Sequence, residues 1–198
     1  RLIGLCFLIP LIYFAFKNGI NKTKPLFFIF LLICFQGVLG WFMVKSGLIN
    51  RIDVSHFRLS IHLLVAFIIL SLILWNYLKI KNIYNDFDKI NIVLPITFLI
   101  LVFLQIVMGA FVSGMDAGTI YTTWPLMGNN YFPDDNYYQN LFKVSAFSDP
   151  SLVQFMHRNL AYIITFYYLF ILYRTYKKKL NKLYTAVNIL GFLIFIQI

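Results

Sequence analysis

Long apolar blocks are the feature that most restricts what this chain can fold into. Crossing a bilayer takes about 20 apolar residues at a rise of ~1.5 Å each. With 61% hydrophobic residues, 12% charged residues and a mean hydropathy of +0.78, the chain does not resemble a soluble domain. Four blocks are long enough to span, and these are Pro25–Val44, Leu59–Leu78, Ile92–Val112 and Leu152–Tyr173.

Two shorter apolar stretches, Leu2–Phe16 and Tyr184–Ile198, stand at the two ends of the sequence. We interpret them as membrane helices cut short by truncation at both ends. A signal peptide is the alternative for the first stretch, although no small-residue cleavage site follows it. The sequence therefore predicts an all-α, polytopic transmembrane helical bundle, with the remainder of one half at 1–89 and most of a second half at 90–198.

Basic residues alternate between the connections. Those on one side hold Lys45, Arg51, Arg58 and Lys143 together with five of the seven acidic residues. Because lysine-rich loops stay on the cytoplasmic or matrix side, the other connections are predicted to face inward. The net charge of +10 is then a matter of membrane topology, and no nucleic-acid partner is needed. The inward connections carry Lys17, Lys22, Lys24, Lys79, Lys81, Lys89, Arg174, Lys177, Lys178, Lys179 and Lys182.

Two histidines lie at matched depth near the outer ends of predicted helices. His62 is one turn into its helix with Arg58 four residues before it, and His157 is two turns into its helix with Arg158 directly after it. An imidazole for iron with a guanidinium toward the interface suits a haem and its propionates. A hydrogen bond between helices, or the polar pathway of a transporter, stays open on these residues alone.

His56 precedes His62 by six residues, about 240° around a helix, so the two cannot share one metal. We place it in the loop or at the interface. The outer loop 113–151 has no obvious helix, and its tyrosines, tryptophan and prolines argue for order. It is either an aromatic anchor in the interface or a cap over an outward-facing site.

An internal repeat is indicated by hydropathy and charge. A shift of 161 residues overlays the first apolar stretch on the body of the block at 152–173, aligns the lysine-rich connections and lands Gln36 on Gln197. Orientation is kept, so the repeat is parallel. Each half would own two histidines, on its second and fourth helices, and one of each pair would lie beyond the ends of this sequence.

Four segments resemble the haem A synthase family and occur in that family's order. They are GWFMVKSGL (Gly40–Leu48), VSHFRLSIHL (Val54–Leu63), GAFVSGMDAGTIYTTWPLMG (Gly109–Gly128) and SLVQFMHRNLAY (Ser151–Tyr162). The resemblance implies a fragment of an eight-helix protein built from two four-helix bundles related by a pseudo-two-fold axis. The lack of loop cysteine pairs is similar to the mitochondrial and proteobacterial branch.

What the resemblance implies is oxidation of a ring methyl of haem o to a formyl group, which gives haem a for terminal oxidases. His62 would be an axial ligand of the substrate haem and His157 of a haem b cofactor, with Arg58 and Arg158 as propionate partners. The family's important acid lies in a loop that this sequence lacks. Asp116 is similar to its second-half counterpart, and no catalytic role is expected for it.

The resemblance also implies an integral protein of the bacterial cytoplasmic membrane or the mitochondrial inner membrane. Its partners would be the lipid bilayer, haem o and the haem O synthase that supplies it, and a homo-oligomer stays open. An electron-carrying b-type cytochrome and a transporter are the alternative functions. The fragment by itself is expected to be inactive, because each iron site would lack one histidine.

Overall fold

The structure is a computed structural model that describes residues 2–47, 54–81 and 91–197. Across these ranges the regular structure is helical, and the expected all-α polytopic membrane fold is confirmed. The predicted boundary after residue 89 falls outside the described residues. The α-helices are α1 (Leu2–Asn18), α2 (Ile20–Gly47), α3 (His56–Ile80), α4 (Val93–Gly114), α5 (Pro150–Lys177) and α6 (Asn181–Gln197).

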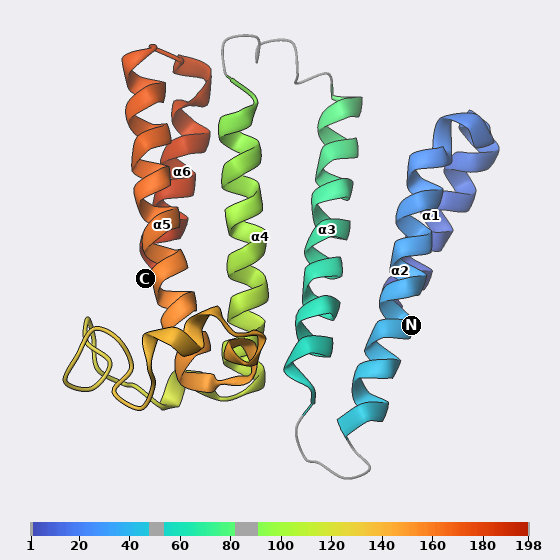
Figure 1. The fold of residues 1–198 in the computed structure, drawn as a ribbon. Helices are drawn as coiled ribbons and strands as arrows, with labels where there is room; N and C mark the ends of the chain where they lie inside the picture. Colours follow the sequence, from blue (N-terminus) through green and yellow to red (C-terminus); the bar gives the residue numbers. More distant parts are fainter. Residues whose placement is uncertain (1, 48–53, 82–90, 198) are drawn as a thin grey trace. The chain divides into compact units, whose positions relative to one another are not determined.

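Two compact units divide the chain, unit 1 at Arg1–Asn85 and unit 2 at Asp86–Ile198. Unit 1 contains α1, α2 and α3, and α2 packs on both of the others. In unit 2, α5 packs on both α4 and α6 (Figure 1). Each predicted apolar block lies on a single helix, since the main-chain groups of a helix bond to one another and need no partner in lipid.

Within the described residues, three helices are long and apolar enough to cross a membrane by length and composition: α2, α3 and α4. Helix α5 was expected to be a fourth, and at 28 residues it matches α2 in length. It does not meet the same measure of composition, because both of its ends are polar: the last turn carries Arg174 and Lys177, and the first turns carry Gln154, His157, Arg158 and Asn159. The polar residues of the first turns are the ones that meet the outer loop and helix α4.

Many large apolar side chains on the helices are exposed in the chain itself, for example Phe16 at 87% and Phe195 at 79%. A soluble protein would bury such residues, whereas lipid solvates them, so this surface fits a membrane protein. Cys6 and Cys34 are free cysteines that are exposed on this surface as well.

The outer loop is folded, as its composition predicts, and it contains helical turns that the sequence did not indicate. These are the 3₁₀-helices η1 (Ala117–Thr119), η2 (Tyr138–Phe142) and η3 (Val144–Ser148). Phe132 lies at the centre of the loop, stacked on Tyr138 at 4.0 Å and edge-on to Phe155 of α5 at 5.0 Å, measured between ring centroids. The loop therefore has a small apolar core that is continuous with α5.

Helix α5 begins where this loop ends. The Asp149 carboxylate accepts a hydrogen bond from the backbone N–H of Leu152 at 3.1 Å, and Pro150 follows at the first helical position. This is a strong N-terminal signal, because a side-chain oxygen satisfies a free helix N–H and proline needs none. Asn136 also donates to the Asp149 carboxylate, at 3.0 Å, so the cap ties the loop to the helix.

A second carboxylate organises the tip of the loop. Asp134 accepts hydrogen bonds from the backbone N–H of Asn129 at 2.6 Å and from the side-chain amide of Asn130 at 2.7 Å. These bonds hold the pKa of Asp134 below its ordinary value. Gly128 has a positive φ of 84°, and a Cβ there would collide with the same carboxylate. The tip thus depends on an ionised Asp134 and on glycine at 128.

We expect a low pH to destabilise the folded tip of the outer loop. A carboxyl group whose pKa is lowered by folding stabilises the folded form above its ordinary pKa, and that contribution is lost as the pH falls through the folded pKa. We expect proteolysis in the loop to accelerate as the pH falls through this range in the natural chain. The Asp134→Asn variant should be cleaved readily already at neutral pH and show a flatter dependence. Identical pH profiles for the two proteins would contradict this role.

Candidate functional site

His157 faces helix α4 from α5. The side-chain nitrogen Nε2 of Gln105 donates to the main-chain oxygen of His157 at 3.3 Å and lies 3.3 Å from the ring nitrogen Nε2. Gly109, one turn further along α4, leaves space for the ring, because a Cβ at this position would meet His157 Cε1 at 3.3 Å. The imidazole is therefore packed against the α4 backbone and is contacted by one glutamine.

His62 faces helix α2 from α3 in the same way. Gln36 Nε2 donates to the main-chain oxygen of His62 at 2.8 Å and lies 3.4 Å from the ring nitrogen Nε2. A Cβ on Gly40 would meet His62 Cε1 at 3.2 Å. Unit 1 and unit 2 each contain one such arrangement of glutamine, glycine and histidine, which we name the Gln-Gly-His module.

The modules share a sequence pattern that the sequence analysis missed. FQGVLGWF (Phe35–Phe42) and LQIVMGAF (Leu104–Phe111) align without gaps, with glutamine and glycine four residues apart in both. That spacing puts the two residues on one face of a helix, one turn from each other. The two segments form a local repeat at a shift of 69 residues. The repeat at a shift of 161 residues does not align these two segments with each other.

Each module contains buried polar atoms that lack a hydrogen-bond partner among the described residues. They are Nδ1 of His62 and His157, and Oε1 of Gln36 and Gln105. Leaving such an atom unpaired costs about 1–3 kcal/mol, so these atoms mark the place where a ligand is expected. A neutral imidazole nitrogen is a good ligand for haem iron, and these residues fit that group.

The modules offer few protein ligands to an isolated metal ion. In the part of the chain that the structure describes, no group of three or more His, Cys, Asp or Glu side chains is placed to hold a metal. A porphyrin brings its own ring nitrogens, so one or two histidines suffice for its iron. The chemistry of the donor set therefore favours haem over an isolated ion.

The two arginines are engaged with main-chain oxygens. Arg158 donates to the oxygens of Tyr121 at 2.7 Å and Thr123 at 2.8 Å, both in the outer loop. Arg58 donates to the oxygen of Phe42 at 3.1 Å, with its guanidinium 3.9 Å above the ring of that residue. Both guanidinium groups keep further N–H donors, and the propionate role stays a prediction.

His56 and Asp116 lie apart from the modules. His56 is the first residue of α3, at the interface end where we expected it, and its ring centroid is 4.2 Å from that of Phe57. Asp116 follows α4 with a positive φ of 51° and precedes η1, where its main-chain oxygen accepts from the Thr119 hydroxyl at 2.8 Å. Its structural place is a turn, and the expectation that it has no catalytic role stays a prediction.

The outer loop is fastened to the helix that carries His157. Besides Arg158, Gln154 donates to the oxygen of Tyr121 at 2.9 Å, and the indole of Trp124 donates to the Tyr162 hydroxyl at 2.8 Å. These three α5 residues are spaced by four, so they form one stripe along the helix. His157 lies off that stripe and faces α4, so the loop and the imidazole occupy different faces of α5.

Fold and site together define an integral, polytopic helical membrane protein with one Gln-Gly-His module in each of its two units. A family model described as cytochrome oxidase assembly protein matches residues 1–198. The chain belongs to this family.

Curated relatives are similar over nearly the whole chain, and those described here are named haem A synthase. The relative from Pelagibacter ubique is 44% identical over 186 residues, covering 93% of this chain and 55% of its own length. A Rickettsia bellii relative is 40% identical and a Flavobacterium psychrophilum relative 41% identical, with 100% of this chain covered. This chain spans 61% and 60% of those two proteins. No solved structure matches the chain.

Helix α2 offers a matched pair of glycines to test the packing of the module. A Cβ on Gly37 meets nothing within 4 Å, whereas one on Gly40 presses on the His62 ring. Alanine is favoured over glycine in a helix by about 1 kcal/mol, so Gly37→Ala should keep or raise the unfolding temperature in detergent. Gly40→Ala should lower it, because the ring and helix α3 must shift. Equal temperatures for the two variants would refute close packing at Gly40.

Proposed function

We propose that this chain is part of a haem A synthase, a membrane oxidoreductase that oxidises a ring methyl of haem o to a formyl group, and that it carries one histidine of each iron site. The observation that carries the proposal is the pair of Gln-Gly-His modules, each with a buried imidazole nitrogen that lacks a partner among the described residues. Support comes from the family to which the chain belongs and from the names of its relatives.

In this proposal His62 would hold the iron of the substrate haem, and His157 would hold the iron of a haem b cofactor. Haem b would supply a one-electron carrier when it is bound. The residues of the chain bind, orient and shield: the glutamines contact the imidazoles, the glycines admit the rings, and apolar helix faces exclude water.

Because the two histidines belong to different units, each unit would bind its own haem. His62 belongs to unit 1 and His157 to unit 2, and each has its own glutamine and glycine. A b-type cytochrome that only carries electrons would use the same ligands, and a transporter would use the two histidines in a polar pathway without haem. The family and the names of the relatives favour the synthase over both alternatives.

Product formation tests the proposal directly. The full-length protein, incubated with haem o and an electron acceptor, should yield haem a that is identified by the mass of the extracted pigment. His62→Ala should reduce the yield to background, because a substrate ligand is lost, while Gly37→Ala should keep the full yield. Unchanged product in His62→Ala would remove this residue from the site. Haem-loaded protein that never converts haem o would instead indicate an electron carrier.

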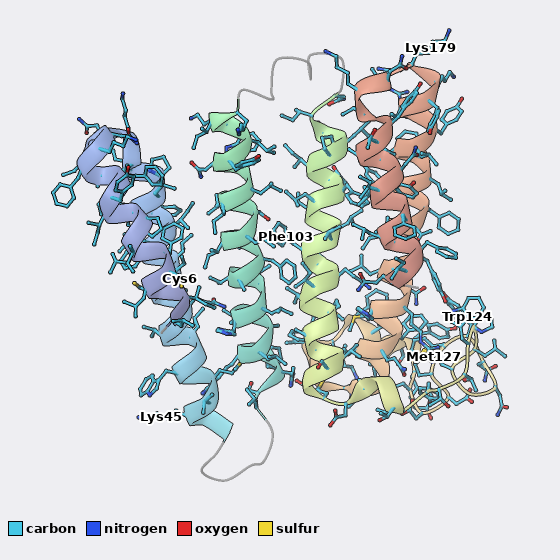
Figure 2. All side chains as sticks on the ribbon, turned by 180° about the vertical axis from the view of Figure 1, so that it is seen from behind. Cys6, Lys45, Phe103, Trp124, Met127 and Lys179 are labelled. Carbon is cyan, nitrogen blue, oxygen red and sulfur yellow. The ribbon has the colours of Figure 1, made fainter. Side chains whose placement is uncertain are left out.

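The orientation in the membrane belongs to the same proposal. Figure 2 shows Lys179 at one end of unit 2 and Trp124 and Met127 at the other, as expected if the lysine-rich turn faces the cytoplasm and the loop faces outward. After replacement of Cys6 and Cys34, a cysteine at the exposed Ser145 should react with a membrane-impermeant thiol reagent in intact bacterial cells. A cysteine at Lys179 should react only after lysis. The reverse pattern would invert the topology.

A further inference from the structure

Each candidate iron ligand is contacted by a half-buried glutamine whose side-chain oxygen is buried and whose role is not explained by packing alone. We propose that Gln36 and Gln105 are positioning residues that fix the orientation and the tautomer of His62 and His157. The inference rests on the proposed function, since it concerns histidines that hold haem. It adds the residues that control these ligands, and Gln105 is the better test because its histidine is assigned to the resident cofactor.

The orientation of each amide is set by the main chain. The amide nitrogen Nε2 donates to the main-chain oxygen of the histidine, at 2.8 Å for Gln36 and 3.3 Å for Gln105. Exchanging the amide oxygen and nitrogen would bring two oxygens together, so the observed orientation is the favourable one. The same nitrogen lies 3.4 Å and 3.3 Å from the ring nitrogens Nε2 of His62 and His157.

This contact selects a tautomer. An amide NH₂ group donates and cannot accept, so the ring nitrogen that faces it must offer its lone pair. The neutral imidazole then carries its proton on Nδ1, the nitrogen that has no partner among the described residues in either module. Without iron, each ring therefore has a defined proton position and one unsatisfied N–H.

Iron changes the requirement on the amide. A histidine bound to a metal carries its remaining proton on the other ring nitrogen, and that N–H is nearly always given to a carbonyl or carboxylate oxygen. Oε1 of Gln36 and of Gln105 are buried acceptors with no partner within the described residues. To present Oε1 to the ring, the amide must rotate and give up its bond to the main-chain oxygen of the histidine. One glutamine can therefore serve the iron-free and the iron-bound imidazole, in two different orientations.

The glycines provide independent support. Gly40 and Gly109 lie one turn from the glutamines on the same helix faces, and a Cβ on either would press on the ring at Cε1. Each imidazole is thus confined between a bare stretch of backbone and an amide. The same confinement occurs in both units, which supports a role for the orientation of the imidazole ring.

The reduction potential of haem b is the property to measure in the full-length protein. A stronger acceptor on the ring N–H gives the ligand more negative character, which favours ferric iron and lowers the potential. We expect Gln105→Glu to lower the midpoint potential and Gln105→Leu, which has no acceptor, to raise it. The Soret and α bands should shift only slightly, because the iron ligand itself is kept.

Gln154→Leu is the matched control. Gln154 is a buried glutamine on α5, one turn before His157, and its amide donates to loop oxygens with no contact to a histidine ring. Its Oε1 also lacks a partner among the described residues, so the control removes an equally unsatisfied amide. The haem b midpoint potential of the Gln154→Leu variant should equal that of the natural protein. Gln36→Leu should leave the haem b potential unchanged and weaken retention of haem o.

The outcomes separate the two proposals. A natural protein that binds no haem would overturn the proposed function, and the role of the glutamines with it. A haem-loaded protein in which Gln105→Glu and Gln105→Leu keep the natural potential, or shift it in the same direction, would overturn only the glutamine role. If Gln105→Leu loses haem, retention in Gln105→Glu and Gln154→Leu would support the role, and equal loss in all three would reject it.

Discussion

A bilayer offers no hydrogen-bond partner to a polar group, so each polar side chain on these helices must be satisfied inside the protein or by a ligand. The contact between a glutamine on one helix and a histidine on the next is where this constraint is most visible. It occurs between α2 and α3 and again between α4 and α5, and it satisfies the groups only in part. In the function that we propose, a haem would bind where these groups are left unsatisfied.

The glycines explain why such contacts form at these places. A helix surface normally keeps a neighbour at side-chain distance, and a glycine lets an imidazole approach the backbone itself. At Gly40 and Gly109 the absence of a Cβ lets the histidine ring lie against the helix backbone. The glutamine one turn away then reaches both the ring and the main-chain oxygen behind it, so packing and hydrogen bonding select the same ring orientation.

Helix α5 shows how one element serves two purposes. One stripe, with Gln154, Arg158 and Tyr162, holds the outer loop through its main-chain oxygens and the Trp124 indole. Another face presents His157 to α4. Arg158 was predicted to reach outward for a propionate, and its observed partners are loop carbonyls, which a charge pattern in the sequence cannot specify. The polar residues needed for both tasks also make α5 the least apolar of the long helices.

The sequence by itself determined the helical membrane fold, the approximate spans and the two histidines of interest. Apolar length and rare intramembrane polar residues are properties of the chain that need no knowledge of packing. Only the tertiary structure decided which helix each histidine faces, and so identified Gln36 and Gln105 as its partners. The reason is that Gln36 and His62 are far apart in sequence, as are Gln105 and His157, and their contact depends on how two helices are rotated against each other. That rotation is set by close packing at single glycines, which hydropathy cannot register.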